Sequence, residues 1–220
     1  MTFRGFPDEG LVFYEGLEAD NSKTYWTRHR AVYDTCVRVP MQALVDELAA
    51  EFGPPKLFRP YRDVRFSNDK TPYKTHQGAV AQQEGRGAGA WYVEVSAEGL
   101  RVAGGAWRLE SDQVERFRRA VADDVQGPRL RTEVDRLAAA GWSIDGDRLT
   151  RVPKGYDVDD GRADLLRHRS LHAGRLFDFA DWLHGAEALE RVRTAWRDLS
   201  ALNAWLADNV GATTKEVRRR

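Results

Sequence analysis

The spacing of apolar residues changes along this 220-residue chain, and this change constrains the fold more than any other feature. In the first fifty residues and again after Glu110, apolar residues recur about every 3.6 positions, which is typical of amphipathic helices. Between Leu57 and Glu110 they alternate with polar residues, as in half-buried strands, with a hairpin-like break at Glu98-Gly99. Because short returns favour antiparallel pairing, the pattern predicts an α+β fold. We expect a mainly antiparallel central sheet flanked by N-terminal, middle and C-terminal helices.

Turn and cap residues predict several boundaries between these elements. Asn21 or Ser22 is expected to cap a long N-terminal helix, since a side-chain oxygen there accepts from free amides of the first turn. Pro40 lies within that helix and has no amide hydrogen to donate, so a kink or a break is expected. Asp145-Gly146 predicts a hairpin between two short strands.

The composition fits a globular chain with no excess of charge. Hydrophobic residues make up 42% of the chain and charged residues 31%, which is enough apolar surface for a core. We expect one domain over residues 1–212 and a basic, frayed tail over residues 213–220. The 34 cationic and 34 anionic side chains cancel, so net charge gives no support to a protein that coats nucleic acid or anionic lipid.

The cysteine content and the distribution of apolar residues predict a cytoplasmic location. Cys36 is the only cysteine, which rules out an internal disulfide framework and suits a reducing compartment. The N-terminal residues lack the apolar core of a secretory signal. No run approaches the ~18–20 apolar residues that cross a bilayer, so no membrane partner is expected.

The stretch RPYRDVRFSNDKTPYKT, residues 59–75, gathers five cations, two aspartates and two tyrosines. Alternation over residues 63–67 predicts a strand whose polar side chains share one side and whose apolar side chains face the core. The turn that follows is expected to bring two lysines near the end of this strand. Arginine matches planar oxyanions and lysine adds point charge. The predicted ligand-binding residues are Arg62, Ser67, Lys70 and Lys74, and the candidate catalytic residues are Asp63, Arg65 and Tyr73.

This chemistry favours a cleft for a small phosphate- or carboxylate-bearing ligand and leaves enzymatic activity open. In an enzyme, Arg65 and the lysines would stabilise negative charge, and Tyr73 or Asp63 would transfer a proton. One alternative is a solvated strand edge with Asp–Arg ion pairs. Another is a non-catalytic module that uses the same basic strip against nucleic acid or an acidic protein. The residues specify no cofactor, substrate or oligomeric state.

The segment DVRFSNDKTPYKT resembles the central motif of a bacterial and fungal family known as domain of unknown function 2461 (DUF2461). The resemblance extends over most of the chain, and the family implies no reaction. Ser22 departs from the pattern, because a second asparagine is common there, and Tyr25-Trp26 replaces the usual Trp-Phe. We hypothesise that Lys154 and Tyr156 approach residues 62–74 as a second basic-aromatic element. Further matching positions are Asn21 with Tyr25 and Trp26, Gly105–Trp107, and Pro153–Tyr156.

Other motifs support no separate site. His168 and His172 lie four apart but have no neighbouring Glu or Cys ligand, so no metal site is predicted. His29 and Cys36 are two helical turns apart, about 10 Å of rise, which is too far for a nucleophilic pair. The glycine-rich residues 84–90 lack the Lys-Ser/Thr of a P-loop and are interpreted as a hairpin loop. The aspartates within 157–160 are interpreted as a turn or a helix start rather than as acids or cation ligands.

Overall fold

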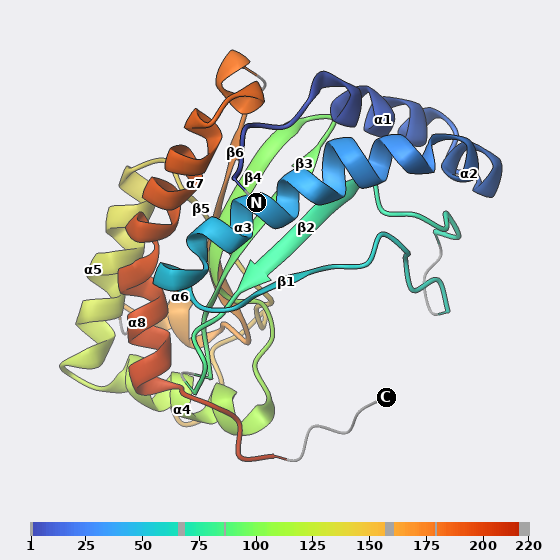
Figure 1. Cartoon of the computed structure of the whole chain (residues 1–220). Coiled ribbons are helices and arrows are strands. Elements are labelled where there is room, and N and C mark those ends of the chain that lie inside the picture. The colour runs from blue at the N-terminus through green and yellow to red at the C-terminus, as the bar shows by residue number, and fades with distance from the viewer. Residues whose placement is uncertain (1, 66–68, 86, 157–160, 179, 216–220) are drawn as a thin grey trace. The chain divides into compact units, whose positions relative to one another are not determined.

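A computed structural model of the protein describes residues 2–65, 69–85, 87–156, 161–178 and 180–215 (Figure 1). Its strands form one sheet in the order β1-β2-β3-β4-β6-β5. The pairs β1–β2 and β5–β6 are antiparallel, and β3 and β4 are neighbours joined by a short turn. The strands are β1 Pro55–Leu57, β2 His76–Ala81, β3 Ala90–Ser96, β4 Gly99–Ala106, β5 Ser143–Asp145 and β6 Leu171–Phe177.

Helices precede, interrupt and follow the strands along the chain, which confirms the predicted α+β class. Two short helices of other types, the π-helix η1 and the 3-10 helix η2, accompany the α-helices. The α-helices are α1 Asp8–Ala19, α2 Lys23–Val32, α3 Val39–Phe52, α4 Ser111–Ala122, α5 Gln126–Ala139, α6 Ala163–Leu166, α7 Glu187–Asp198 and α8 Ser200–Asn209. The other two are η1 Tyr33–Arg38 and η2 Asp181–His184.

The chain divides into two compact units, each made of three segments. Unit 1 consists of Met1–Ala81, Tyr92–Val102 and Leu176–Ala195. Unit 2 consists of Gln82–Trp91, Ala103–Arg175 and Trp196–Arg220. The single domain expected over residues 1–212 stays a prediction. Of the tail expected to be frayed, Thr213, Thr214 and Lys215 make hydrogen bonds within unit 2, and residues 216–220 lie outside the described residues.

Unit 1 is built on α2, η1 and α3, which follow one another without a loop (Figure 1). Ser22 begins this run, because its side-chain oxygen accepts from the Tyr25 amide, and the predicted cap is confirmed. Pro40 lies in the first turn of α3 and cannot donate to the carbonyl four residues earlier. The irregularity expected at Pro40 takes the form of the π-helical turns of η1, which end just before it. α3 packs against β1 and β2, and α1 packs against α2.

The core of unit 1 is strongly aromatic where α1 packs against α2. Trp26 lies 4.7 Å from Tyr33 and 5.7 Å from Phe13, measured between ring centroids. All three residues are buried, so each brings a large apolar area out of water. These rings form the support against which the segment 59–75 packs.

In unit 2, α5 packs against α4, α8 and β5 (Figure 1). The hairpin predicted at Asp145-Gly146 is wrong, because β5 pairs with β6, beginning at Ser143 opposite Gly174. After Gly146, Arg148 forms an isolated antiparallel bridge with His168, which precedes β6. The glycine-rich loop before β3 does join neighbouring strands, β2 and β3, as predicted.

Candidate functional site

The segment 59–75, in unit 1, is a loop in its described residues. Its two ends are held together by the bridge Tyr61–Tyr73 and by an N–H···O bond of 2.9 Å from Arg62 to Pro72. Residues 62–65 form no strand, so the strand predicted over 63–67 is wrong there, and Phe66, Ser67 and Asn68 lie outside the described residues. The physical reason is local. The Asp63 side chain accepts from the Arg65 amide, and this turns the backbone away from an extended course.

Arg62 and Arg65 form ion pairs with the two aspartates of this segment. The Arg65 guanidinium donates to both carboxylate oxygens of Asp63, at 2.9 and 2.6 Å, although 71% of the Arg65 side chain is exposed. Arg65 lowers the pKa of Asp63 to about 2. Arg62 forms an ion pair with Asp69, and Lys70 donates to the Val64 carbonyl at 2.9 Å. Asp63 and Arg65 therefore stabilise each other at the surface.

Tyr73 and Lys74 contribute to packing in unit 1. The Tyr73 ring is 5% exposed and stacks on Trp26, with 4.3 Å between centroids and 7° between ring planes. Asn21 clamps the Tyr73 backbone with two bonds, donating to its carbonyl at 3.0 Å and accepting from its amide at 3.1 Å. Burial raises the pKa of Tyr73. The Lys74 ammonium lies 5.2 Å from the centroid of the Phe58 ring, and partial burial lowers its pKa.

A cluster of titratable side chains on β2, β3 and β4 escaped the sequence analysis. Glu94 accepts from the Tyr92 hydroxyl at 2.5 Å and from Arg101 Nε at 3.1 Å, and its carboxylate lies 3.6 Å from His76 Nε2. Burial lowers the pKa of His76 more than the neighbouring carboxylate raises it. No single stretch of sequence signals this cluster, because its members meet only when the strands pair.

Unit 2 contains a pocket of about 790 Å³, which lies within the usual range for small-molecule sites. It combines apolar and aromatic walls with four cations and two carboxylates. The apolar and aromatic lining residues are Trp107, Leu109, Val114, Leu149, Pro153 and Tyr156. The charged and polar ones are Arg108, Arg118, Lys154, Arg169, Glu115, Asp147, Ser111 and Ser170.

One face of α4 forms a wall of this pocket. Ser111, Val114, Glu115 and Arg118 follow the three- and four-residue spacing that places side chains on one side of a helix. A reciprocal capping box fixes where the helix begins, since Gln113 accepts from the Glu110 amide while the Glu110 side chain caps the first turn. Ser111 is the first residue of α4, and the periodicity predicted after Glu110 located this helix without assigning its polar face.

Arg118 is the half-buried cation of the pocket. Its Nε donates to the Leu166 carbonyl at 3.2 Å, which orients the guanidinium. Within the part of the chain that the structure describes, its two terminal nitrogens have no hydrogen-bond partner and no carboxylate pairs with it. Burial lowers the pKa of Arg118, Tyr156 raises it and Arg169 lowers it, so both neighbours are close enough to act on its charge. Two guanidinium groups that repel across one space favour an anion between them.

Trp107 forms the aromatic wall at the end of β4. Its ring stacks on His172, with 5.2 Å between centroids and 19° between planes, and 40% of the residue is exposed. Gly105 makes this approach possible: its φ is +133°, and a Cβ there would lie 2.4 Å from the Leu171 carbonyl oxygen. The residue that the family resemblance singled out thus brings Trp107 beside β6.

The turn Pro153–Tyr156 brings two predicted residues to the pocket. Tyr156 donates its amide to the Pro153 carbonyl at 3.4 Å, and Gly155 has a φ of +89°, the conformation of the third residue of a type II turn. Lys154 and Tyr156 both line the pocket. They belong to unit 2 and residues 62–74 to unit 1, so the approach of these two elements stays a prediction.

The opposite wall is an antiparallel pair of segments with its own internal bonds. Arg169 donates to Asp147 at 2.8 Å, and the Asp147 amide donates to the Ser170 hydroxyl at 2.7 Å. His168 is 3% exposed, and its Nδ1 lies 2.7 Å from the Ser170 carbonyl oxygen. These bonds hold Asp147, Arg169 and Ser170 at fixed positions around the space.

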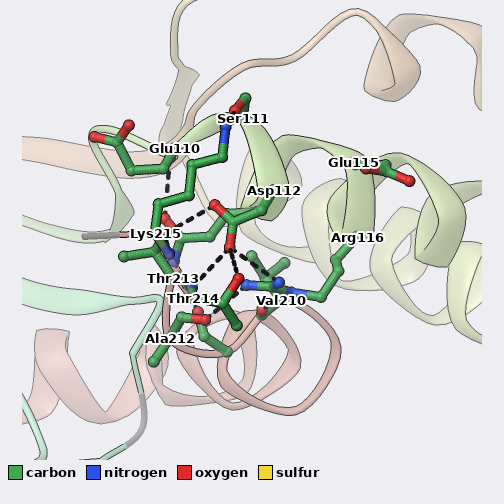
Figure 2. A network of polar contacts seen from close by, with 12 residues as sticks. Glu110, Ser111, Asp112, Glu115, Arg116, Val210, Ala212, Thr213, Thr214 and Lys215 are labelled. Atoms are coloured by element: carbon green, nitrogen blue, oxygen red, sulfur yellow. Dashed lines mark hydrogen bonds and ion pairs between the residues drawn. The ribbon is translucent and has the colours of Figure 1, made fainter. Parts of the chain in front are cut away.

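A second pocket of about 330 Å³ shares Trp107 and Arg108 with the first. One of its walls is Ala212 and Thr213, part of a C-terminal strap that we define as residues 210–215. Figure 2 shows how the strap is tied to α4. Asp112 accepts from the Thr213 hydroxyl at 2.8 Å and the Thr214 amide at 2.9 Å. Arg116 donates to the carbonyls of Val210 and Ala212, each at 2.6 Å.

The described ranges offer no candidate metal cluster and no candidate membrane span. No group of three or more His, Cys, Asp or Glu residues there is arranged to hold a metal ion. His168 and His172, singled out by their spacing, instead contact a backbone carbonyl and a tryptophan ring. Among the same residues, no helix has both the length and the apolar character to span a membrane.

Comparison with known proteins gives a family and no activity. A family model described as "Conserved hypothetical protein (DUF2461)" matches residues 9–205. No curated protein and no solved structure matches the chain. The match covers most of the chain and both candidate regions, and it confirms the resemblance inferred from the motif.

Proposed function

Because the chain belongs to the DUF2461 family, whose description names no activity, we propose a function from the site: the protein binds a small phosphate- or carboxylate-bearing ligand in the pocket of unit 2. The observation that carries this proposal is Arg118, a half-buried guanidinium that faces the pocket without a carboxylate partner in the described chain. Leaving such a charge unpaired is costly unless a ligand or solvent satisfies it.

The balance of charge in the pocket supports an anionic ligand. The four lining cations outnumber the two lining carboxylates, and Asp147 is already bonded to Arg169. Lys154, like Arg118, has no ion-pair partner among the described residues. Arg118 offers planar, forked donors and Lys154 a mobile point charge, which together suit phosphate or carboxylate oxygens.

The magnitudes show why the aromatic wall matters. Three charge-assisted hydrogen bonds contribute about 5–9 kcal/mol, and association costs at least ~4 kcal/mol. The remainder corresponds to a millimolar or weaker complex for most of that range. Stacking on Trp107 or contact with Tyr156 adds the apolar contribution that an organic anion has and a bare anion lacks.

Whether the ligand also reacts is left open by this proposal. Tyr156 is the aromatic lining side chain with a hydroxyl proton to transfer, and Arg118 and Arg169 are placed to stabilise developing negative charge. We further propose a cytoplasmic location, because the only cysteine, Cys36, is free and this suits a reducing compartment.

The test is a thermal-shift screen of nucleotides, sugar phosphates and carboxylates, followed by titration calorimetry on any hit. A ligand at a hundred times its Kd stabilises by about 2.7 kcal/mol, which for a chain of this size raises Tm by about 5–10 °C. We expect Arg118→Gln to weaken binding at least tenfold. Arg129→Gln, the same change at an exposed residue of α5 that lines neither described pocket, is the matched control and should bind as the wild type does.

Two results would contradict the proposal. One is a ligand whose affinity depends on Arg65 and not on Arg118, because this would indicate that the ligand binds at the segment 59–75. The other is the absence of any stabilising anion together with tight, strongly salt-dependent binding of single- or double-stranded nucleic acid, which would favour the non-catalytic module.

A further inference from the structure

We infer that the ligand has two parts, an anionic group in the larger pocket and a flat, uncharged ring in the smaller pocket, on either side of Trp107. This inference rests on the proposed function and specifies its ligand class as organic phosphates or carboxylates that carry a neutral ring. Its first support is that both pockets are lined by Trp107 and Arg108. The two spaces therefore adjoin at this pair of side chains.

The two pockets differ in charge. Arg108 is the only charged residue that lines the smaller pocket among the described residues, and it is shared with the larger one. The rest of the lining is small or neutral: glycines and alanines of the loop before β3, the end of β4, Gln82, Gln113 and Thr213. Backbone with small side chains lets a flat group approach closely and offers amide hydrogen bonds without charge.

The volumes and the aromatic wall agree with a ring. The smaller pocket holds about 330 Å³, near the lower end of the usual range for ligand sites and enough for one or two fused rings. Trp107 is 40% exposed and lines this space, so a ring of the ligand has an aromatic edge or face to pack against. Stacking of this kind is tolerant of ring identity.

The strap, residues 210–215, closes the smaller pocket on one side. Ala212 and Thr213 line it, and the bonds from Asp112 and Arg116 hold them there (Figure 2). Gln113, which also lines the pocket, donates to the Gly211 carbonyl at 2.7 Å. Lys215 bonds to Ser111, a residue of the larger pocket, so the strap borders both spaces. A ligand ring should therefore reduce the mobility of the strap, whereas an anion alone should leave it unchanged.

The first experiment compares inorganic phosphate with phenyl phosphate, glycerol phosphate and four nucleoside monophosphates by titration calorimetry on the full chain. We expect at least one ring-bearing phosphate to bind at least tenfold more tightly than inorganic phosphate, and glycerol phosphate to show no such gain. If phosphate binds and no ring improves it, the inference is overturned while the proposed function stands. If no anion binds, the proposed function itself has failed.

The second experiment fills the smaller pocket. Ala212→Phe should remove the gain that the ring provides and leave the affinity for inorganic phosphate within twofold of wild type. Ala201→Phe, the same change at an exposed residue of α8, is the matched control and should keep the gain. A ring-dependent gain that survives Ala212→Phe would overturn the inference.

A third measurement covers the case in which Ala212→Phe disturbs folding. Hydrogen exchange of the amides of Gly211 to Thr214 should slow in the presence of the ring-bearing ligand and stay unchanged with inorganic phosphate. Asp112→Asn, which weakens the ties of the strap, should lower the affinity for the ring-bearing ligand at least fivefold and that for phosphate by less than twofold. Equal losses for both ligands would place the whole ligand in the larger pocket.

Discussion

The segment 59–75 of unit 1 and the pocket of unit 2 use the same residue types to opposite effect. In the segment, cations and aspartates lie two to seven residues apart and pair with each other, as Asp63 does with Arg65 and Arg62 with Asp69. In the pocket, Arg108, Arg118, Lys154 and Arg169 come from separate segments, and two of them have no acidic partner in the described chain. Short separations in sequence thus let two of the five cations of the segment pair locally, whereas the proposed site collects cations that are distant in sequence.

The two regions also differ in solvent exposure, which determines how much their charges affect the free energy of the fold. Most of the Arg65 side chain is exposed, and ion pairs in water contribute little to stability. Arg118 is half-buried, and burial lowers its pKa, so its charge is costly without a counterion. The same guanidinium group forms a surface ion pair in one region and is proposed to bind an anion in the other.

The largest effect on stability is expected at the wall of the pocket in unit 2. Gly105→Ala should lower the free energy of unfolding by about 3 kcal/mol or more, because the added Cβ meets the backbone of Leu171 and His172 at a positive φ. Urea denaturation measures this. Gly155→Ala, also at positive φ but in open space, should cost only about 1–2 kcal/mol. Equal costs would show that the wall of the pocket is less rigidly packed than the contacts imply.

A smaller effect is expected at the anchor of the segment 59–75. Asn21→Ala removes both hydrogen bonds to the Tyr73 backbone and should cost about 1–3 kcal/mol, mostly from the unsatisfied partners left behind. Hydrogen exchange should speed up at Tyr73 while ligand affinity in unit 2 stays unchanged. Loss of that affinity would mean that the two regions act together rather than independently.

A third effect depends on pH. The pH range in which stability changes distinguishes unit 2 from the segment 59–75. Burial lowers the pKa of His168 below its unfolded value near 6.5, so the unfolded chain takes up the proton first as pH falls. The stability associated with neutral His168 is present above pH 6.5 and is lost as pH falls toward the lower folded pKa. His168→Gln should flatten the fall in Tm between pH 7 and pH 5. An unchanged slope would assign that fall to other groups, with His76 and His172 next to test.

The smallest effect is expected at the exposed ion pair of Asp63 and Arg65. The pKa of Asp63 is lowered from 3.8 to about 2, so its contribution is present above pH 3.8 and is lost as pH falls through 2. Because the pair with Arg65 is exposed, the double variant Asp63→Asn, Arg65→Gln should leave Tm at pH 7 unchanged within error. A clear loss of ligand binding in this variant, with the fold intact, would restore the segment as the site.

The sequence predicted those features that depend on neighbours along the chain. The spacing of apolar residues predicted the α+β class, and a hydroxyl side chain before a helical pattern predicted the cap at Ser22. A short turn predicted that β3 and β4 pair. The sequence misassigned residues 63–65 because alternation cannot distinguish a strand from a loop in which Asp63 bonds its own backbone. Lys154 and Tyr156 were found through a motif, whereas Arg118 and Arg169 were missed, because only tertiary contacts bring α4 and the β5–β6 region around one space.

Trp107 gives the protein an optical signal of its own. Of the seven tryptophans, five are buried and Trp182 is half-buried, which leaves Trp107 as the one most open to solvent. Its emission should dominate the fraction quenched by acrylamide, and a guest that covers its ring should shield it. Occupancy of either cavity can therefore be followed by fluorescence on the unlabelled wild-type chain, before any ligand has been identified by other means.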